Sequence, residues 1–304
     1  MNDIVTAHQL SFSYRNTTVI KKIDLTIREG SIFGFVGPNG AGKSTTIKLL
    51  LGLLKPQSGS ITIFGKEITG SRVEILRQIG SMVETPSLYP HLTGGENIEV
   101  IRRIMDIPRS AIDHVLSLSG ILDAKDKKVK EYSLGMKQRL GIALSLLHSP
   151  KLLILDEPIN GLDPEGIREF RMLLQQLTAG EGITVLLSSH ILSELEQVIT
   201  SVGIISAGEM KFLGSLEELK KLQRGKLIIE VSDPKKSVDI LRRQSISVLQ
   251  AESGRLTIES GGRDAIASIN SLLVQNNIGI YELKFDQPNL ESVFLSLIRE
   301  GNGQ

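Results

Sequence analysis

The chain reads Gly37-Pro38-Asn39-Gly40-Ala41-Gly42-Lys43-Ser44-Thr45 near its start. This stretch fits G-x-x-x-x-G-K-[ST], a loop whose backbone N–H groups surround nucleotide phosphates. The apolar run 32–36 before it predicts a buried strand, and 44–54 after it predicts a helix. A plain glycine-rich turn would explain the glycines but not Lys43 and Ser44 in register. We therefore expect Lys43 to reach the β- and γ-phosphates of a bound nucleotide and Ser44 to hold Mg²⁺.

The overall composition is that of a globular protein with a full core. Hydrophobic residues make up 40% and charged residues 23% of the 304 residues, and there are no cysteines. The formal net charge is +1, so no global field attracts nucleic acid, and we expect no nucleic-acid partner. No apolar run approaches the ~20 residues that span a bilayer. Any membrane-spanning partner is therefore expected to be a separate polypeptide.

The hydrophobic pattern divides the chain into an alternating part and a later part. Residues 1–70 predict short strands, including 10–14 and 61–64, and residues 71–150 predict helices at 109–118 and 134–147, with a capping box at Thr93–Glu96. A further strand at 151–155 is followed by a predicted helix at 164–177. Another strand at 183–187 is followed by a predicted helix that extends through Leu195. This alternation predicts a parallel sheet covered on both faces.

The pattern changes near residue 220, where Lys220 to Gly225 is predicted to be a polar connector. We expect two domains, residues 1–219 and 220–304. The second has the order β-α-β-β-α-β-α, which is similar to a small ferredoxin-like domain. Its predicted strands are 226–231, 246–250, 255–259 and 278–285, and its predicted helices are 233–243, 263–275 and 288–298.

Two carboxylates end the apolar strand at residues 152–155. Asp156 is placed to hold Mg²⁺ opposite Ser44, and Glu157 to orient or deprotonate an attacking water. An acidic pair that only closes a strand–loop junction is the structural alternative. Together with the phosphate loop, the pair predicts hydrolysis of a nucleoside triphosphate.

The segment Tyr132-Ser133-Leu134-Gly135-Met136-Lys137-Gln138-Arg139 resembles the signature motif of ABC-type ATPases. Ser133 and Gly135 match the usual Leu-Ser-Gly-Gly-Gln form, whereas Leu134 and Met136 depart from it. The resemblance implies that Ser133 and Gly135 contact the nucleotide of a partner subunit. An ordinary N-capped helix would use similar residues, and Leu134 puts close backbone contact with the phosphate in doubt.

Three further positions match the same family in order and spacing. Asn160 to Asp163 resembles the loop that crosses the dimer interface, and His190 resembles the histidine that contacts the γ-phosphate and the attacking water. Tyr14 fits the aromatic residue that stacks on adenine. Each of the three has a structural alternative. Asn160 to Asp163 could be a turn that starts a helix at Pro164, His190 could be a structural histidine, and Tyr14 could be an aromatic residue packed in a strand.

Glu84 stands where most family members carry glutamine. The resemblance implies that it contacts Mg²⁺ or water, although an ionised carboxylate cannot donate a hydrogen bond. Glutamate here is typical of the ATPases of bacitracin and lantibiotic exporters, and the ending Pro288 to Phe294 is similar to theirs. A solvated loop glutamate, and simple helix packing of the ending, are the alternatives.

The resemblance therefore predicts an α/β P-loop NTPase fold of the ABC ATPase type, with antiparallel β and helical subdomains and a small C-terminal α+β ferredoxin-like domain. It implies an ATP- and Mg²⁺-dependent ATPase that powers export of bacitracin-like peptides or drugs. We expect an ATP-bound homodimer on an integral membrane permease, at the cytoplasmic face of the membrane. The alternatives are a non-transport ABC ATPase acting on ribosomes or nucleic acid, a P-loop kinase or GTPase, and a ligand-sensing regulatory ATPase.

Overall fold

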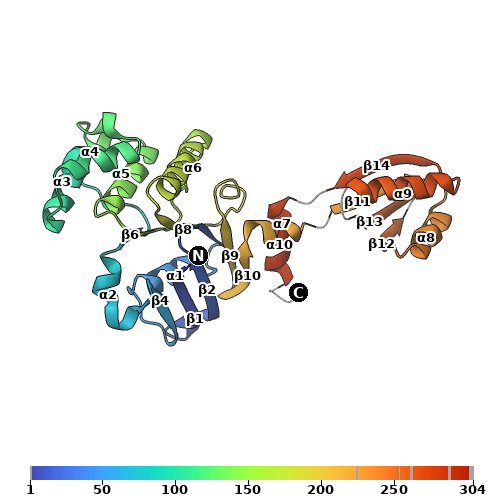
Figure 1. Cartoon of the computed structure of the whole chain (residues 1–304), viewed down its shortest axis with the longest axis horizontal. Coiled ribbons are helices and arrows are strands. Elements are labelled where there is room, and N and C mark those ends of the chain that lie inside the picture. The colour runs from blue at the N-terminus through green and yellow to red at the C-terminus, as the bar shows by residue number, and fades with distance from the viewer. Residues whose placement is uncertain (1, 224, 253, 261–262, 287–288, 301–304) are drawn as a thin grey trace. The chain divides into compact units, whose positions relative to one another are not determined.

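A computed structural model describes residues 2–223, 225–252, 254–260, 263–286 and 289–300 (Figure 1). Contacts divide the chain into unit 1, residues 1–216 and 297–304, and unit 2, residues 217–296. The expected boundary after residue 219 falls inside helix α7 (Leu216–Lys221). Lys220 and Lys221 therefore end a helix, and the prediction that they begin a connector was wrong.

Unit 1 begins with an antiparallel sheet. Its strands are β1 (Asp3–Tyr14), β2 (Thr17–Arg28), β4 (Ser58–Ile63) and β5 (Lys66–Glu67), in the order β2-β1-β4-β5. Side chains alternate between buried and exposed along β2, as expected for a sheet with one face on the core. The expected strand 61–64 is shorter at its end, because Phe64 has a positive φ of 53°.

A second sheet of six strands has the order β10-β9-β3-β8-β7-β6. The strands are β3 (Ile32–Val36), β6 (Ile79–Met82), β7 (Leu152–Leu155), β8 (Thr184–Ser189), β9 (Ser201–Ser206) and β10 (Glu209–Ser215). All but β10 run parallel. The prediction that residues 71–150 are helical missed β6. Strands β9 and β10 were not predicted either.

The parallel register brings the carboxyl ends of four strands to one edge. Val36 lies opposite Ser189, and Leu155 lies opposite both Leu187 and Met82. The loops that leave β3, β6, β7 and β8 therefore start side by side, which is where open parallel sheets bind ligands. These loops carry the phosphate-loop motif, Glu84, the acidic pair and His190.

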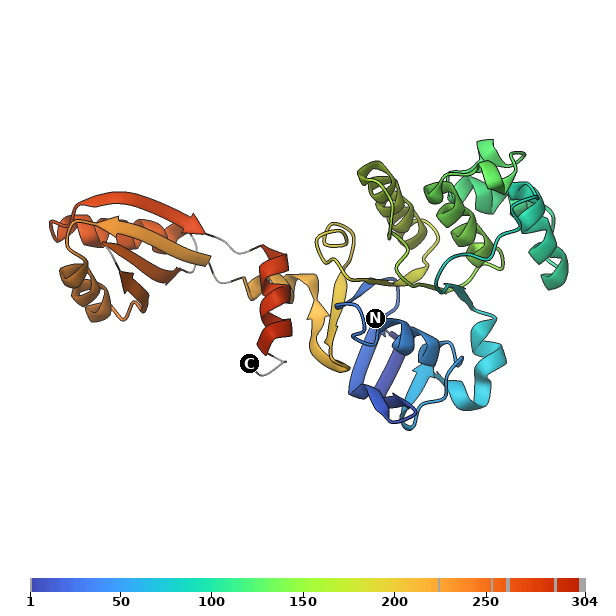
Figure 2. The ribbon, with the colours of Figure 1, turned by 180° about the vertical axis from the view of Figure 1, so that it is seen from behind.

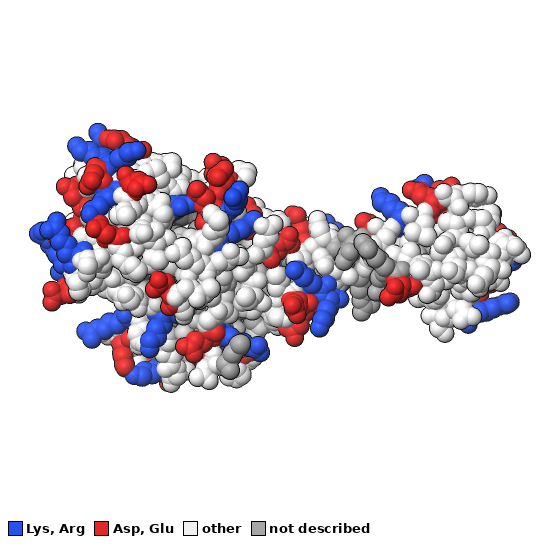
Figure 3. Space-filling view, turned by 45° about the horizontal axis from the view of Figure 1, so that its top comes forward, with Lys and Arg blue, Asp and Glu red and all other residues white. Residues whose placement is uncertain are grey.

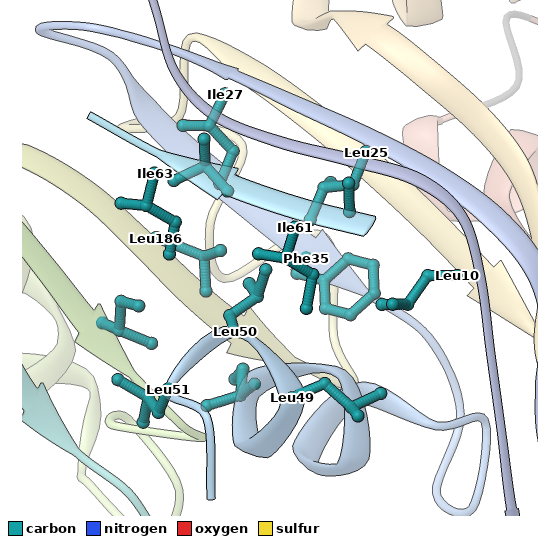
Figure 4. Packing of buried hydrophobic residues seen from close by; sticks show 14 of the residues in the cluster. Leu10, Leu25, Ile27, Phe35, Leu49, Leu50, Leu51, Ile61, Ile63 and Leu186 are labelled. Atoms are coloured by element: carbon teal, nitrogen blue, oxygen red, sulfur yellow. The ribbon is translucent and has the colours of Figure 1, made fainter. Parts of the chain in front are cut away.

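Helix α1 (Lys43–Leu50) lies between the two sheets of unit 1 (Figure 4). Its Leu49 and Leu50 are fully buried with Phe35 of the parallel sheet and Ile61 of the antiparallel sheet. The helix ends before the expected Leu54, because the chain turns at Gly52 with a φ of 62°. Burial on both sides fixes the helix that follows the phosphate loop.

Helices cover the remaining part of unit 1, as the ribbon shows from both sides (Figures 1 and 2). They are α2 (Ile68–Leu76), α3 (Gly94–Met105), α4 (Ser110–Leu118), α5 (Leu134–Leu146) and α6 (Pro164–Ala179), with short 3₁₀ turns at Leu122–Ala124 and Val129–Glu131. None of the described helices is long and apolar enough to cross a membrane.

The expected helix through Leu195 was wrong. Residues 191–199 form turns, although Leu192, Leu195 and Val198 are buried at helix-like spacing. The chain has only residues 190–200 in which to return from the end of β8 to the start of β9, which runs parallel beyond β3. The backbone hydrogen bonds in this segment mix two spacings, since the Leu192 and Leu195 carbonyl oxygens each accept from residues three and four positions later. Successive turns therefore bury the same side chains that a regular helix would bury.

Unit 2 has the predicted ferredoxin-like topology. Its strands are β11 (Gly225–Val231), β12 (Val248–Glu252), β13 (Arg255–Ser260) and β14 (Ile280–Asp286), in the antiparallel order β12-β13-β11-β14. Helices α8 (Pro234–Arg243) and α9 (Arg263–Gln275) pack on the face of the sheet that buries Leu227, Ile229 and Leu256. Helix α10 (Leu290–Glu300) follows, and the predicted first residue of this ending, Pro288, lies outside the described residues.

We predict that Thr93→Ala destabilises the protein by about 1 kcal/mol, because it removes the capping box of α3. The Thr93 hydroxyl accepts from the Glu96 N–H at 3.1 Å, and the Glu96 carboxylate accepts from the Thr93 N–H at 2.7 Å. Urea unfolding measures the change. Thr93→Ser keeps the acceptor and should lose little; equal losses in both variants would contradict the capping role.

Candidate nucleotide site

A cavity of about 560 Å³ opens at the carboxyl edge of the parallel sheet. Its lining residues come from the end of β1, the start of β2, the phosphate loop with the start of α1, and the loops that follow β7 and β8. They are Tyr14, Val19, Asn39, Gly40, Gly42, Lys43, Ser44, Thr45, Glu157, Asn160 and His190. This volume is within the range that small-molecule and cofactor sites occupy.

The phosphate loop has the backbone geometry that its motif predicts. Gly42 is the N-cap residue of α1, with a φ of 110° that favours glycine, and no side chain caps the helix. A Cβ atom on Gly37 would lie 2.2 Å from the Ile205 carbonyl oxygen. The first N–H groups of α1 thus lack a side-chain partner at the cavity, which suits a phosphate.

Lys43 holds three parts of this edge together. Its side chain is only 6% exposed, and its ammonium donates to the Gly37 carbonyl oxygen at 2.7 Å. The same Nζ lies 3.1 Å from Oε1 of Glu157. A buried ammonium needs partners of this kind, since an unpaired buried charge is costly. The contact joins the loop after β3 to the end of β7.

Glu157 lies at the centre of the polar contacts. Its Oε2 is 2.9 Å from Nδ1 of His190, and because a carboxylate only accepts, Nδ1 is the donor in this contact. Glu157 also has a φ of 48°, a left-handed conformation that costs a non-glycine residue roughly 1–2 kcal/mol. Such strain persists where surrounding contacts fix a residue, often at functional sites.

The pKa of the neighbouring Glu194 is raised by the burial of its carboxyl group. The charge of Glu157 adds to this rise, and the charge of His190 opposes it.

Ser188 connects the two members of the acidic pair. Its hydroxyl donates to Oδ1 of Asp156 at 2.6 Å and accepts from the Glu157 N–H at 2.8 Å. Asp156 is 5% exposed, and Ser188 is fully buried. Sequence reasoning missed Ser188 as a functional residue; its position after an apolar strand and before Ser189-His190 was the available signal.

The side chains of one chain supply only part of the oxygen ligands that a Mg²⁺ ion needs. Ser44 lines the cavity, whereas Asp156 does not and lies directly before the lining residue Glu157. Hydroxyl and carboxylate oxygens are ligands that Mg²⁺ prefers. The described residues contain no cluster of three acidic or histidine side chains that would hold a metal by themselves. This fits an ion that also takes phosphate oxygens as ligands.

Glu84 lies beside α1 and is not among the residues that line the cavity. Its carboxylate is 2.9 Å from Nζ of Lys48, and its side chain is 69% exposed. Its predicted contact with Mg²⁺ stays a prediction. Tyr14 does line the cavity, is 46% exposed and makes an edge-to-face contact with Phe12 at 4.8 Å, so it combines strand packing with a ring open to a ligand.

Ser133 and Gly135 line a second cavity of about 400 Å³, together with Gly161, Leu162 and Asp163. The Ser133 hydroxyl accepts from the Met136 N–H at 3.2 Å and caps α5. Asp163 caps α6 through the Gly166 N–H at 2.9 Å. The predicted nucleotide contacts of one chain therefore lie in two separate cavities.

Comparison with known proteins connects this geometry to a family. Residues 20–160 match the ABC transporter domain model. The chain is 42% identical over 306 aligned residues to the bacitracin transport ATP-binding protein BcrA of Bacillus licheniformis, covering 99% of both chains. It is 44% identical to the lantibiotic transport ATP-binding protein SrtF of Streptococcus pyogenes, covering 73% of this chain and 96% of that one.

The chain belongs to the ABC transporter ATP-binding proteins. A solved structure of cbiO1 from Clostridium perfringens, part of the ABC transporter complex cbiONQ, matches with a TM-score of 0.68 and 27% identity over 81% of this chain and 97% of that one. The predicted family and fold class are confirmed. ABC transporter ATP-binding proteins bind and hydrolyse ATP to power transport, and this chain is an ATPase of that kind.

We predict that Ser188→Ala lowers the stability of this ABC ATPase by about 1–3 kcal/mol and reduces its ATPase rate, because a buried Asp156 oxygen loses its donor. Thermal unfolding and phosphate release measure the two effects. Ser189→Ala is the matched control, since among the described residues the buried Ser189 hydroxyl hydrogen-bonds to the backbone of Ile191 and to no carboxylate. The bridging role of Ser188 is excluded if both variants behave alike.

Proposed function

We propose that this chain is the ATPase subunit of an exporter for bacitracin-like peptides, acting as a homodimer on a separate membrane permease. Likeness to the bacitracin relative carries the choice of substrate, because an alignment over 99% of the chain includes unit 2 as well as unit 1. The lantibiotic relative matches only 73% of the chain. Bacitracin-like peptides are therefore favoured over lantibiotics.

In the proposed reaction, Glu157 takes a proton from a water molecule whose oxygen attacks the γ-phosphorus. The bond from phosphorus to the bridging oxygen breaks, and ADP and phosphate leave. The Glu157 carboxylate lies between Lys43 and His190 and holds both side chains. The Lys43 ammonium would offset phosphate charge, and the His190 imidazole would orient the attacking water. Bound Mg²⁺, held by Ser44 and Asp156 with phosphate oxygens, would add Lewis-acid stabilisation of the triphosphate charge.

The second cavity supports the proposed dimer. Ser133 and Gly135 do not line the Lys43 cavity of their own chain, so contact with a nucleotide would have to come from another copy. Leu134, which departs from the family pattern, is 49% exposed at the start of α5. A head-to-tail pair about a two-fold axis would set each Ser133 against the partner's phosphate loop.

The surface of the chain supports a protein partner and not nucleic acid. Basic and acidic side chains are interspersed over the face in Figure 3, and the formal net charge is +1. None of the described helices could cross a membrane, and the likeness to transport ATP-binding proteins supports a separate permease as the path of the peptide. We therefore propose a position at the cytoplasmic face of the membrane.

Mixing two inactive variants tests the dimer. Lys43→Ala removes a phosphate charge partner, and Ser133→Arg blocks the partner's nucleotide. A head-to-tail heterodimer retains one intact site, so mixing should restore roughly a quarter of the wild-type rate if subunits exchange randomly. Lys55→Ala, at an exposed position, should remain active alone. No recovery on mixing, with both variants folded, would rule out sites shared between chains.

The transport function is tested by deleting the gene, restoring it on a plasmid as wild type or variant, and measuring bacitracin resistance. Wild-type protein should restore bacitracin resistance and co-purify with an integral membrane protein. Glu157→Gln should not restore resistance, because loss of the general base reduces hydrolysis by about 10²–10⁴; Glu181→Gln, at an exposed position, should. Unchanged bacitracin resistance overturns the substrate, and co-purification with ribosomes overturns the transport role.

A further inference from the structure

Lys48 and Glu84 form an ion pair beside the phosphate-binding helix. Lys48 lies on α1, one helical turn after Ser44, and Glu84 lies on the loop that follows β6. Their charged atoms are 2.9 Å apart, with Lys48 32% exposed and Glu84 69% exposed. The pair joins the helix that begins at the nucleotide cavity to the segment that leads into α3.

The backbone at Glu84 is in an unusual conformation. Glu84 has a φ of 64°, a left-handed conformation that disfavours any residue with a side chain. A strained position of this kind persists when surrounding contacts determine it. The Lys48 ammonium is the charged partner of the Glu84 carboxylate, and the rigid, buried helix α1 carries it.

Lys48 also feels the charge of Asp156, the first carboxylate of the acidic pair. Its pKa is raised, mainly by the hydrogen bond to Glu84, and the charges of Tyr14 and Asp156 act in the same direction. Its own carbonyl oxygen accepts from the N–H groups of Leu53 and Leu54, which fixes the backbone from which the side chain extends. Lys48 thus contacts Glu84 after β6 and interacts electrostatically with Asp156 after β7.

We infer that Lys48 is a positioning residue for ATP hydrolysis, which holds the Glu84 carboxylate and its loop against the phosphate-binding helix. A carboxylate accepts a charge-assisted hydrogen bond from an ammonium, which a neutral glutamine amide does not match. The pairing therefore suits glutamate at position 84. It would make the loop from Val83 to Leu92 follow α1, and with it the helical segment that starts at α3.

This inference rests on the proposed ATP site, and a set of variants separates the two. Lys48→Gln and Glu84→Gln should each raise KM for MgATP by roughly two- to five-fold, the size expected for a solvent-exposed ion pair, with a smaller change in kcat. Lys48→Gln should have no further effect in the Glu84→Gln background. Lys48→Arg should restore the wild-type KM, because it keeps the charge. The exposed pair Lys66 and Glu74 supplies the control Lys66→Gln, which should leave KM unchanged.

A second measurement does not depend on turnover. Hydrogen–deuterium exchange of residues 83–92 without nucleotide should be faster in Lys48→Gln than in wild type, and Lys48→Arg should match wild type. Multiplied effects in the double variant, no rescue by arginine, or unchanged exchange would overturn the inference. If Lys43→Ala binds ATP as tightly as wild type, the proposed ATP site itself fails, whatever the Lys48 variants show.

Discussion

The contact between Lys43 and Glu157 is the interaction on which the site depends. It buries an ammonium against a carboxylate and a backbone carbonyl, and such a group is stable only with partners in place. The partners come from loops that leave two strands separated by β8 in the sheet. A shift of one residue in the register would turn the side chains of a strand to the opposite face, so the parallel pairing of β3, β8 and β7 is a condition for the contact.

Strain at two glutamates belongs to the same arrangement. Glu157 and Glu84 both adopt left-handed backbone conformations, and each has its carboxylate within 3.1 Å of a lysine on α1. Ser188 adds a second restraint on the Glu157 backbone. The buried helix α1 therefore anchors both glutamates. Its first residue, Lys43, holds Glu157, and Lys48 near its end holds Glu84.

The separation of the two cavities accounts for the division of roles along unit 1. The parallel sheet carries the residues around Lys43, whereas the starts of α5 and α6 carry Ser133 and Asp163. Leu134, the first residue of α5, reaches toward the loop before α6, since its Cδ2 is 3.0 Å from the position of a Cβ on Gly161. The leucine that departs from the family pattern thus fills space against the neighbouring loop in its own chain.

Local patterns in the sequence determined the phosphate loop, the capping box at Thr93, the strands that precede the phosphate loop, the acidic pair and His190, and the order of elements in unit 2. These features depend on residues close together in the chain, through backbone conformation, capping and alternation of apolar side chains. The acidic pair in the sequence pointed to Glu157 and the family resemblance to His190, and the structure brings these two side chains together at 2.9 Å.

Only the tertiary structure decided the contacts between distant segments. The bridge made by Ser188, the partner of Glu84, the strands β9 and β10, and the turns that replace the helix through Leu195 all depend on which strands are neighbours in the sheet. Strand order and loop length set these contacts, and no pattern within a short window of sequence encodes them. The sequence by itself therefore determined which chemical groups are present, and the packing of the sheets around α1 decided which of them meet.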